Sequence, residues 1–470
     1  VSGILPGSIS VSGVTQGRSI SLQSVNGISL GDVSALVGSV ALESLLGGAI
    51  TAGNVTAITS VNIDTSGALT AGAMNAQTVR VGGTTAPSSA AFSGIVTAND
   101  FAASVAGALT FSSVSQIGTI SGLSVGAPLS LTNDTSNLTI SGVVGAGSQD
   151  VTIRNSGDLT LAAGGRINGG LVALSAGDQF INLRGSDAVS ASDRWVVYSA
   201  APVGNTFGNL DSGNTAIWNG TIDTVAPGSV TGNRYVFAFQ PTLTFASTDN
   251  SKVYGTDLTG ALNGFFAVSG LQDGVTGAYL ADTLAGVVSG TPTITSLGAA
   301  ANADVAGGPY ELAISQGSLT SLTGYQLAFD SAGRLTVTPK PITGSVAVDT
   351  KTYDGTTAGT GTVTLTGVLA GDTVGTAGTT FTFADRNAGT GKTVAVAGTT
   401  LTGADAGNYT LSIPASALAD ILARAITGSV AVDTKTYDGT TVGTGTVTLT
   451  GVLAGDTVGT AGTTFTFADR

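Results

Sequence analysis

The sequence predicts an all-β protein in which a right-handed parallel β-helix is followed by immunoglobulin-like β-sandwich modules in tandem. The chain of 470 residues contains 70 glycines and is rich in Thr, Val and Ser, which are residues of turns and strands. Its acidic residues are aspartates except at Glu43 and Glu311, and aspartate favours turns where glutamate favours helices. Residues 342–386 also recur as residues 426–470, with a single difference, and a fixed repeat period is typical of tandem modules.

Composition also excludes several classes of function. The net charge of −13 argues against binding to nucleic acid or anionic lipid. The chain has no Cys and no His, which excludes disulfides, Cys/His zinc sites and catalysis by Ser-His-Asp or Cys-His groups. A chain without cysteine suits the cytosol, and it equally suits a bacterial exoprotein that crosses an outer-membrane pore unfolded. The tandem repeat favours the exoprotein.

The sequence shows no recognisable targeting or membrane-spanning segment. Its most apolar run, residues 33–50, contains Glu43 and several glycines, so we interpret it as core rather than as a membrane span. No signal peptide is visible and Val1 is not an initiator methionine, so we expect the natural N-terminal region to be missing.

Residues 1–190 are predicted to form the β-helix, as the C-terminal part of a longer shaft. Short β-runs follow one another at intervals of 20 to 22 residues, for example at Leu129, Val151 and Leu171. An interval of this length matches one turn of a parallel β-helix, whose strands stack about 4.8 Å apart. A stack of antiparallel hairpins is the alternative.

Residues 191–241 are predicted to cap the β-helix. The last turn of a solenoid exposes an apolar cross-section and an unpaired edge, and both need to be covered. The alternative is a surface on which carbohydrate rings stack. Either interpretation rests on one group of aromatic residues: Trp195, Tyr198, Phe207, Trp218, Tyr235, Phe237 and Phe239.

The remaining chain is divided into three predicted modules, 242–341, 342–425 and a truncated 426–470. Strand and module lengths favour an immunoglobulin-like sandwich for each. Pro339 and Pro341 are expected to stiffen the first junction, because proline restricts the backbone. Ala423 and Ala425 stand in the corresponding places of the second junction, which we expect to bend more.

The repeated segment KTYDGTT, at residues 351–357, is interpreted as structural. Asp354-Gly355 predicts a tight turn, and Tyr353 is expected to pack its ring while its hydroxyl reaches a backbone partner. The segment GTGKT, residues 389–393, superficially looks like a phosphate loop, but Arg386 stands where that motif needs glycine and no helix is expected to follow.

Aspartates and asparagines are interpreted as turn residues rather than as ligands. Calcium between modules was considered for Asp372, Asp385, Asp405 and the segment 133–137, but the spacing of a calcium loop is absent. Arg184-Gly185-Ser186-Asp187 is no integrin-type tripeptide, because serine intervenes. Sequons for glycosylation are treated as incidental in a Thr-rich chain; they begin at Asn54, Asn133, Asn137, Asn219 and Asn408.

Several segments resemble known bacterial exoproteins. The segments RWVVYS (194–199), TFGNLD (206–211) and GNRY (232–235) through QPTL (240–243) resemble the end of the β-helix in filamentous-haemagglutinin-like proteins. Residues 243–341, with KVYGT, resemble the glycine-rich MBG module, and KTYDGTT at Lys351 and Lys435 resembles the YDG module. The chain departs from the family in lacking its N-terminal secretion domain, and ILARAIT (421–427) lacks the usual prolines.

The resemblance implies two-partner secretion from a Gram-negative bacterium through an outer-membrane transporter. It implies a protein that is secreted or held on the outer-membrane surface and that acts in cell adhesion, not as an enzyme. We therefore expect a fragment of a large adhesin that mediates attachment or aggregation through an extended repetitive β scaffold. Its partner would be a glycan or protein on a host or neighbouring cell.

Two alternatives stay open at this point. One is a β-helix enzyme acting on polysaccharide, which would need paired carboxylates and basic groups along a groove. The other is a purely structural stalk whose binding tip lies elsewhere. For the adhesin we expect no catalytic residue, no cofactor, no metal ligand and no nucleic-acid partner.

Overall fold

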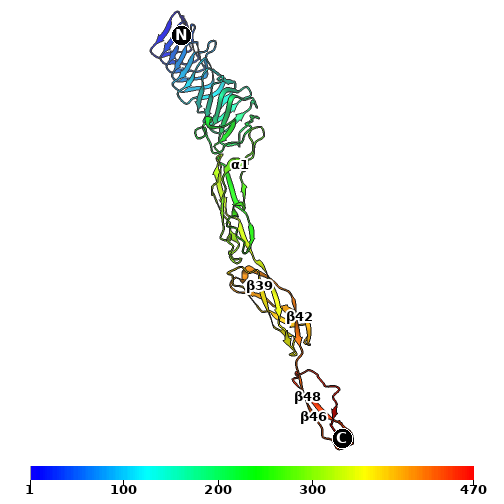
Figure 1. The fold of residues 1–470 in the computed structure, drawn as a ribbon. Helices are drawn as coiled ribbons and strands as arrows, with labels where there is room; N and C mark the ends of the chain where they lie inside the picture. Colours follow the sequence, from blue (N-terminus) through cyan, green and yellow to red (C-terminus); the bar gives the residue numbers. More distant parts are fainter. Residues whose placement is uncertain (1) are drawn as a thin grey trace. The chain divides into compact units, whose positions relative to one another are not determined.

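The computed structural model describes residues 2–470, with side chains from residue 6 onward (Figure 1). Strands dominate it, and the described residues contain one short α-helix, α1 (Leu284–Val287), besides the 3-10 helices η1 (Pro227–Ser229), η2 (Leu262–Gly264) and η3 (Ala406–Asn408). Unit 1 comprises Val1–Phe245, Ala267–Thr293 and Ser315–Asp330, and unit 2 comprises Ala246–Phe266, Ile294–Ile314 and Ser331–Arg470. No helix in the described part of the chain is long and apolar enough to cross a membrane.

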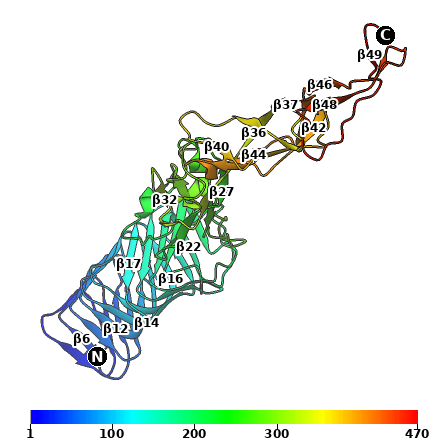
Figure 2. The same cartoon turned by 90° about the horizontal axis from the view of Figure 1, so that it is seen from below.

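A parallel β-helix of about nine turns makes up most of unit 1 (Figure 2). Each strand pairing described within its 25-stranded sheet is parallel, so the predicted fold class is confirmed here and the alternative of antiparallel hairpins is wrong. Its strands are β1 (Ser2–Leu5), β2 (Ser8–Val11), β3 (Thr15–Gly17), β4 (Ile20–Ser24), β5 (Gly27–Leu30), β6 (Val33–Ala35), β7 (Val40–Ser44), β8 (Ile50–Ala52), β9 (Val55–Ala57), β10 (Ser60–Thr65), β11 (Ala68–Ala71), β12 (Met74–Val81), β13 (Ser89–Phe92), β14 (Val96–Val105), β15 (Leu109–Phe111), β16 (Gln116–Val125), β17 (Leu129–Asn133), β18 (Asn137–Ile140), β19 (Val143–Gly145), β20 (Val151–Asn155), β21 (Asp158–Leu161), β22 (Arg166–Ala176), β23 (Phe180–Asn182), β24 (Val189–Ser199) and β25 (Arg234–Phe237).

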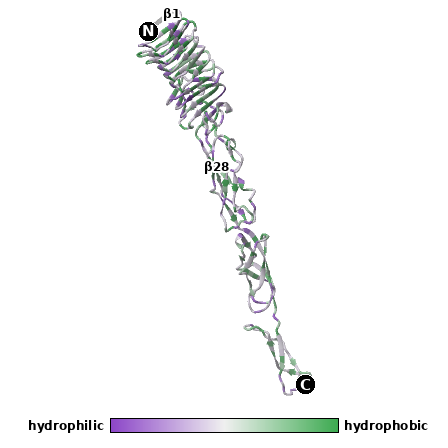
Figure 3. Cartoon of the chain, turned by 90° about the vertical axis from the view of Figure 1, so that its left-hand side faces the viewer, coloured by the Kyte–Doolittle hydropathy of each residue, from purple (hydrophilic) through white to green (hydrophobic). Residues whose placement is uncertain are grey.

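The register of this sheet stacks apolar side chains into columns inside the β-helix. Alternate residues of a strand point inward, and the pairing aligns each inward position with the next turn. Buried and more exposed residues accordingly alternate along strands such as β4 and β7, and hydrophobic and hydrophilic residues are interspersed over the β-helix (Figure 3). One buried column runs through Ile28, Ile50, Leu69, Ala90 and Leu109. A later stretch of the same face continues through Leu129, Val151 and Val172 to Trp195.

Asparagines replace the apolar residues at one inner corner. Asn133 and Asn155 occupy paired positions of β17 and β20, and both are buried. Asn133 Nδ2 donates to Asn155 Oδ1 at 2.9 Å, and Asn155 Nδ2 donates to the carbonyl oxygens of Thr135 (2.9 Å) and Asp158 (2.7 Å). The two amides thereby hydrogen-bond to one another and to the backbone at this corner.

The rest of unit 1 covers the last turn of the β-helix with aromatic side chains. Tyr235 is fully buried among the rings of Phe180, Trp195, Phe207 and Phe237. The cluster extends to Tyr279 and Tyr325 through Trp218. Five short strands lie in or next to this covering part of unit 1: β26 (Thr242–Ser247), β28 (Phe266–Ser269), β29 (Val288–Ser289), β33 (Thr320–Ser321) and β34 (Gln326–Asp330).

Unit 2 consists of small sheets, and the largest of them lie in the YDG-like module at residues 342–425. A three-stranded sheet, β39-β36-β44, and a five-stranded sheet, β37-β45-β42-β41-β38, enclose a core around Phe383 and Val394. The strands of this module are β36 (Lys340–Val348), β37 (Lys351–Thr352), β38 (Ala358–Gly359), β39 (Gly361–Thr366), β40 (Gly375–Ala377), β41 (Thr380–Phe383), β42 (Gly389–Ala397), β43 (Thr400–Thr402), β44 (Tyr409–Ser412) and β45 (Ser416–Leu422). The immunoglobulin-like arrangement stays a prediction.

The second copy repeats the register of the first. Val430 pairs with Val447 as Val346 pairs with Val363, 84 residues earlier. Residues 423–426, which precede the first strand of the second copy, lie outside the strands. At the first junction, Pro339 is the one residue that lies outside the strands. The remaining strands of the chain are β27 (Asn250–Val253), β30 (Thr293–Thr295), β31 (Tyr310–Glu311), β32 (Ala313–Ser315), β35 (Arg334–Thr338), β46 (Thr427–Val432), β47 (Val442–Gly443), β48 (Gly445–Thr450) and β49 (Phe465–Thr466).

Candidate functional sites: a polar groove and the Lys-x-Tyr turns

A polar groove of about 450 Å³ lies on the outer face of the β-helix. It follows β4, β7, β10 and β12, whose outward side chains line it. Its charged groups are Glu43, Asp64 and Arg80, and the pairing of β7 with β10 puts Glu43 and Asp64 on adjacent turns. Two neighbouring carboxylates in a groove are the arrangement that a polysaccharide-cleaving β-helix would need.

The Asp64 carboxylate holds a loop in place through hydrogen bonds. Its carboxylate accepts hydrogen bonds from the backbone N–H groups of Thr84 (2.8 Å) and Thr85 (2.9 Å), and from the hydroxyls of both threonines. Partial burial alone would raise the pKa of Asp64, but these four hydrogen bonds outweigh it and hold the pKa below the ordinary value of 3.8. Asp64 is therefore ionised at neutral pH and unsuited to act as a general acid.

The other charged groups of the groove also have partners. Gln23 Nε2 donates to Glu43 Oε2 at 2.8 Å, and Arg80 forms an ion pair with Asp100 of β14. Glu43 and Asp64 thus both accept hydrogen bonds from polar neighbours, and the groove presents a polar surface on the outside of the β-helix.

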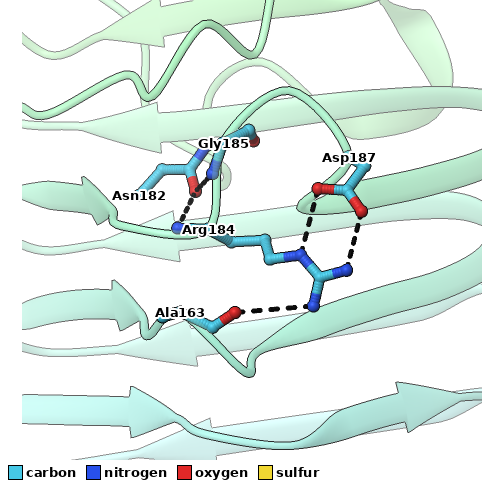
Figure 4. A network of polar contacts seen from close by, with 5 residues as sticks. All are labelled: Ala163, Asn182, Arg184, Gly185 and Asp187. Atoms are coloured by element: carbon cyan, nitrogen blue, oxygen red, sulfur yellow. Dashed lines mark hydrogen bonds and ion pairs between the residues drawn. The ribbon is translucent and has the colours of Figure 1, made fainter.

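Arg184 and Asp187 face one another across a tight loop (Figure 4). Arg184 donates from Nε (3.0 Å) and Nη2 (2.7 Å) to the two oxygens of Asp187. The hydrogen bond from Arg184 is the main reason that the pKa of Asp187 lies below its ordinary value. Asn182 also stabilises the loop, because its Oδ1 accepts hydrogen bonds from the N–H groups of Arg184 and Gly185. Arg184 and Asp187 thus form their ion pair with each other, within the loop.

Five of the seven aromatic residues of 191–241 cannot form a carbohydrate-stacking surface. Trp195, Tyr198, Trp218, Tyr235 and Phe237 are all buried, so their ring faces pack on one another and on apolar side chains. The alternative of a stacking surface is therefore wrong for these five residues.

Other residues considered as ligands have structural partners. GTGKT lies in strand β42, where Lys392 pairs with Asp385, so it is no phosphate loop. Asp405 accepts from the N–H of Thr373 at 2.7 Å. Among the described residues, no group of three or more acidic side chains is placed to hold a metal ion. Of the sequon asparagines, Asn133 and Asn408 are buried.

Each lysine of the Lys-x-Tyr turns, residues 252–256, 351–356 and 435–440, fastens its own turn. Lys351 Nζ donates to the carbonyl oxygens of Thr356 (3.1 Å) and Ala358 (2.7 Å) and lies 2.7 Å from Asp354 Oδ1. The left-handed φ of +76° at Gly355 completes the predicted tight turn, which is confirmed.

The turn of the second copy is fastened in the same way. Lys435 Nζ donates to the carbonyl oxygens of Thr440 and Val442, both at 2.8 Å, and pairs with Asp438 Oδ1 at 2.9 Å. Lys252 in the first turn is buried and donates to the carbonyl oxygens of Thr256 (3.0 Å) and Ala299 (3.2 Å). The three lysines thus share one structural role.

The tyrosine hydroxyls do not reach backbone groups, contrary to the prediction. Tyr353 donates to Asp456 Oδ1 at 2.8 Å, and Tyr254 donates to Asp372 Oδ2 at 2.9 Å. The prediction was wrong because a contact between residues more than 100 positions apart leaves no trace in the local sequence. The signal that could have revealed it is the loop Leu-Ala-Gly-Asp, which recurs at 369–372 and 453–456, at the same interval as the turns 351–356 and 435–440.

We expect the two Asp-Gly turns to titrate alike. The pKa of Asp354 and that of Asp438 are each lowered from 3.8 to about 2, first by the hydrogen bond from the lysine of the same turn. Since the folded pKa is the lower one, the stabilisation is complete above pH 3.8 and is lost as the pH falls through about 2. Carboxyl titration by NMR should give two equally low values.

Lys351→Met is the matched variant for this titration. It keeps an unbranched side chain over the Phe383 ring, above which the Lys351 ammonium lies at 5.7 Å, but removes the donor. We expect it to raise the pKa of Asp354 towards 3.8 and to leave Asp438 unchanged. An unchanged Asp354 would show that the lysine does not fasten the turn.

Residues 338–417 match the YDG domain family, and the second copy at 426–470 repeats part of that region. Neither the curated proteins nor the solved structures contain a match to the chain.

Proposed function

We propose that this chain is part of a bacterial surface adhesin that mediates attachment or aggregation through a repetitive β scaffold. The single observation that carries the proposal is the occurrence of a repeated YDG module in one chain with a parallel β-helix. Both elements are built from repeats, and binding by repeated surfaces gains strength from avidity rather than from one deep pocket. The groove at Glu43 and Asp64, whose carboxylates already accept hydrogen bonds from neighbouring side chains, supports a binding surface over an enzyme.

The same proposal covers export and location. We propose secretion from a Gram-negative bacterium through an outer-membrane transporter of the two-partner type, to the cell surface or the medium. The absence of cysteine and the local pairing of successive β-helix turns support this route, because each turn can fold as it emerges. Residues 243–341 would be a module of the MBG type, and the partner would be a glycan or protein on a host or neighbouring cell.

Binding of the purified chain to cells tests the proposal. We expect the full chain to bind to host or bacterial cells and to promote their aggregation. The enzyme would become the better proposal if the chain bound no cell type but hydrolysed members of a glycan panel, and if Glu43→Gln abolished that hydrolysis.

Deletion of residues 342–470 separates recognition from spacing. If binding is unchanged and only the reach is shorter, the YDG modules are spacers and the β-helix or its cap carries recognition. If binding is lost, the modules themselves recognise the partner.

A further inference from the structure

The two tyrosine–aspartate contacts of unit 2 are the same contact made twice. Asp372 and Asp456 occupy equivalent positions, 84 residues apart, in the two copies of the repeat. Each accepts a hydrogen bond from the tyrosine of the preceding Lys-x-Tyr turn, Tyr254 in one case and Tyr353 in the other. Each tyrosine belongs to the module before the aspartate, so the contact connects one module to the next.

An apolar contact accompanies each hydrogen bond. A Cβ atom added to Gly255 would lie 2.8 Å from Leu369 Cδ1, and one added to Gly355 would lie 3.4 Å from Leu453 Cδ1. Both glycines have a positive φ, which brings the backbone of the turn close to the leucine. Leucine and aspartate come from the same four-residue loop, Leu-Ala-Gly-Asp, in both modules.

The second copy presents the same turn with its tyrosine exposed. Lys435 and Asp438 fasten that turn as Lys351 and Asp354 fasten the first, yet the Tyr437 side chain is 79% exposed. Tyr353, of identical local sequence, is partly buried against the following loop. The turn is therefore formed by its own residues. Tyr353 packs on the core of its own module, around Val394 and Ile421, and its hydroxyl binds the following loop.

We propose that the Lys-x-Tyr turn is a docking surface for the Leu-Ala-Gly-Asp loop of a neighbouring module of the same type. Lysine and aspartate hold the turn, glycine clears room for the leucine, and the tyrosine hydroxyl binds the aspartate of the incoming loop. The turn at Tyr353 holds the loop 453–456, and the turn at Tyr437 offers the same surface to the loop of another module. This coupling goes beyond adhesion and holds whatever the scaffold binds.

The two occupied turns differ in how much they bury. At the first, Tyr409 also donates to Asp372 and Ile342 is 3% exposed. At the second, Arg386 Nη2 lies 3.5 Å from Asp456 Oδ1, and Ile426, the counterpart of Ile342, is 38% exposed. The second coupling buries less apolar surface, so it depends more on the contacts of Asp456 with Tyr353 and Arg386, and this makes it the one to test.

Spin-label distances between the two copies measure the coupling in the full chain. The chain has no natural cysteine, so Thr364→Cys and Thr448→Cys, at exposed equivalent positions, give two unique labels. Docked modules give one narrow distance and undocked modules a broad distribution. We expect Tyr353→Phe and Asp456→Asn each to lower the docked-to-undocked ratio about tenfold, the factor for one lost hydrogen bond to a carboxylate.

Tyr437→Phe is the matched control, because it makes the same substitution in the same local sequence without a docked loop. It should leave the distances unchanged. The double variant Tyr353→Phe/Asp456→Asn should be no worse than Asp456→Asn alone, since that substitution already removes the partner of Tyr353 together with the charge that Arg386 contacts. The proposal would be overturned if the distance distribution of Tyr353→Phe were as narrow as that of Tyr437→Phe. It would also be overturned if the effects of the two substitutions were fully additive in the double variant. Circular dichroism of each variant confirms that the modules stay folded.

Discussion

Tyr235→Ala is expected to lower the free energy of unfolding of unit 1 by about 3 to 5 kcal/mol, the usual cost of emptying a buried aromatic site. The Tyr235 ring lies 5.1 Å from the Trp195 ring and 4.9 Å from the Phe207 ring, both edge to face. Its hydroxyl donates to the carbonyl oxygen of Leu210 at 2.7 Å. Removal of the side chain leaves a cavity and an unpaired carbonyl at the end of the β-helix, where the last turn has no further turn to cover it.

Urea unfolding followed by tryptophan fluorescence measures this effect where it occurs. The chain has two tryptophans, Trp195 and Trp218, and both lie in the aromatic cluster. Tyr235→Phe keeps the ring and should cost about 1 kcal/mol, the contribution of one hydrogen bond. Tyr437→Ala removes an exposed tyrosine and should change nothing. Equal effects of Tyr235→Ala and Tyr437→Ala would mean that the cluster does not stabilise the end of the β-helix.

The sequence predicted the β-helix because its determinants are local and periodic. Leu129 and Val151 recur at the interval of one turn, and the pairing of β17 with β20 puts them in the predicted column. Aromatic density after residue 190 likewise predicted a covered end. It could not predict that Tyr279 and Tyr325 join that cluster, because they lie far along the chain and no local pattern marks them.

Polar residues were harder to assign from the sequence, because one residue type serves several purposes. Asp64, Asp187 and Asp372 all looked like turn aspartates, yet they fasten a loop, pair with an arginine and receive a tyrosine, respectively. Which of these an aspartate does depends on the residue that folding brings beside it. The tyrosine–aspartate coupling shows where the sequence did carry information, since the aspartates recur 84 residues apart and each tyrosine stands in a Lys-x-Tyr segment.

The segment containing Asn133 was considered as a calcium loop, but its asparagine lies inside the β-helix. Buried amides need partners for both the oxygen and the nitrogen. Asn133 Oδ1 accepts from the N–H of Ile117 at 2.7 Å, and its Nδ2 donates to the Ile117 carbonyl oxygen at 2.9 Å. With its amide nitrogen enclosed in this way, Asn133 is also unsuited to carry a glycan.

Asn155→Ala is expected to destabilise the β-helix by about 2 to 4 kcal/mol, because it removes a buried amide that donates two hydrogen bonds to half-buried carbonyls. The carbonyl oxygens of Thr135 and Asp158 lose the Asn155 amide, and Asn133 Nδ2 loses one of its acceptors. The free energy of unfolding from urea titration measures the loss. Asn62→Ala is the control on the outer face, where the exposed amide donates to the Ser60 hydroxyl, and it should stay within about 0.5 kcal/mol of the parent.

Asn155→Leu distinguishes hydrogen bonding from simple space filling at this corner. Leucine restores the volume that alanine lacks and would suit the apolar columns on either side. If the asparagines served only to fill the corner, Asn155→Leu would be as stable as the parent. We expect it instead to be about as unstable as Asn155→Ala, because no hydrocarbon side chain can donate to the carbonyls of Thr135 and Asp158.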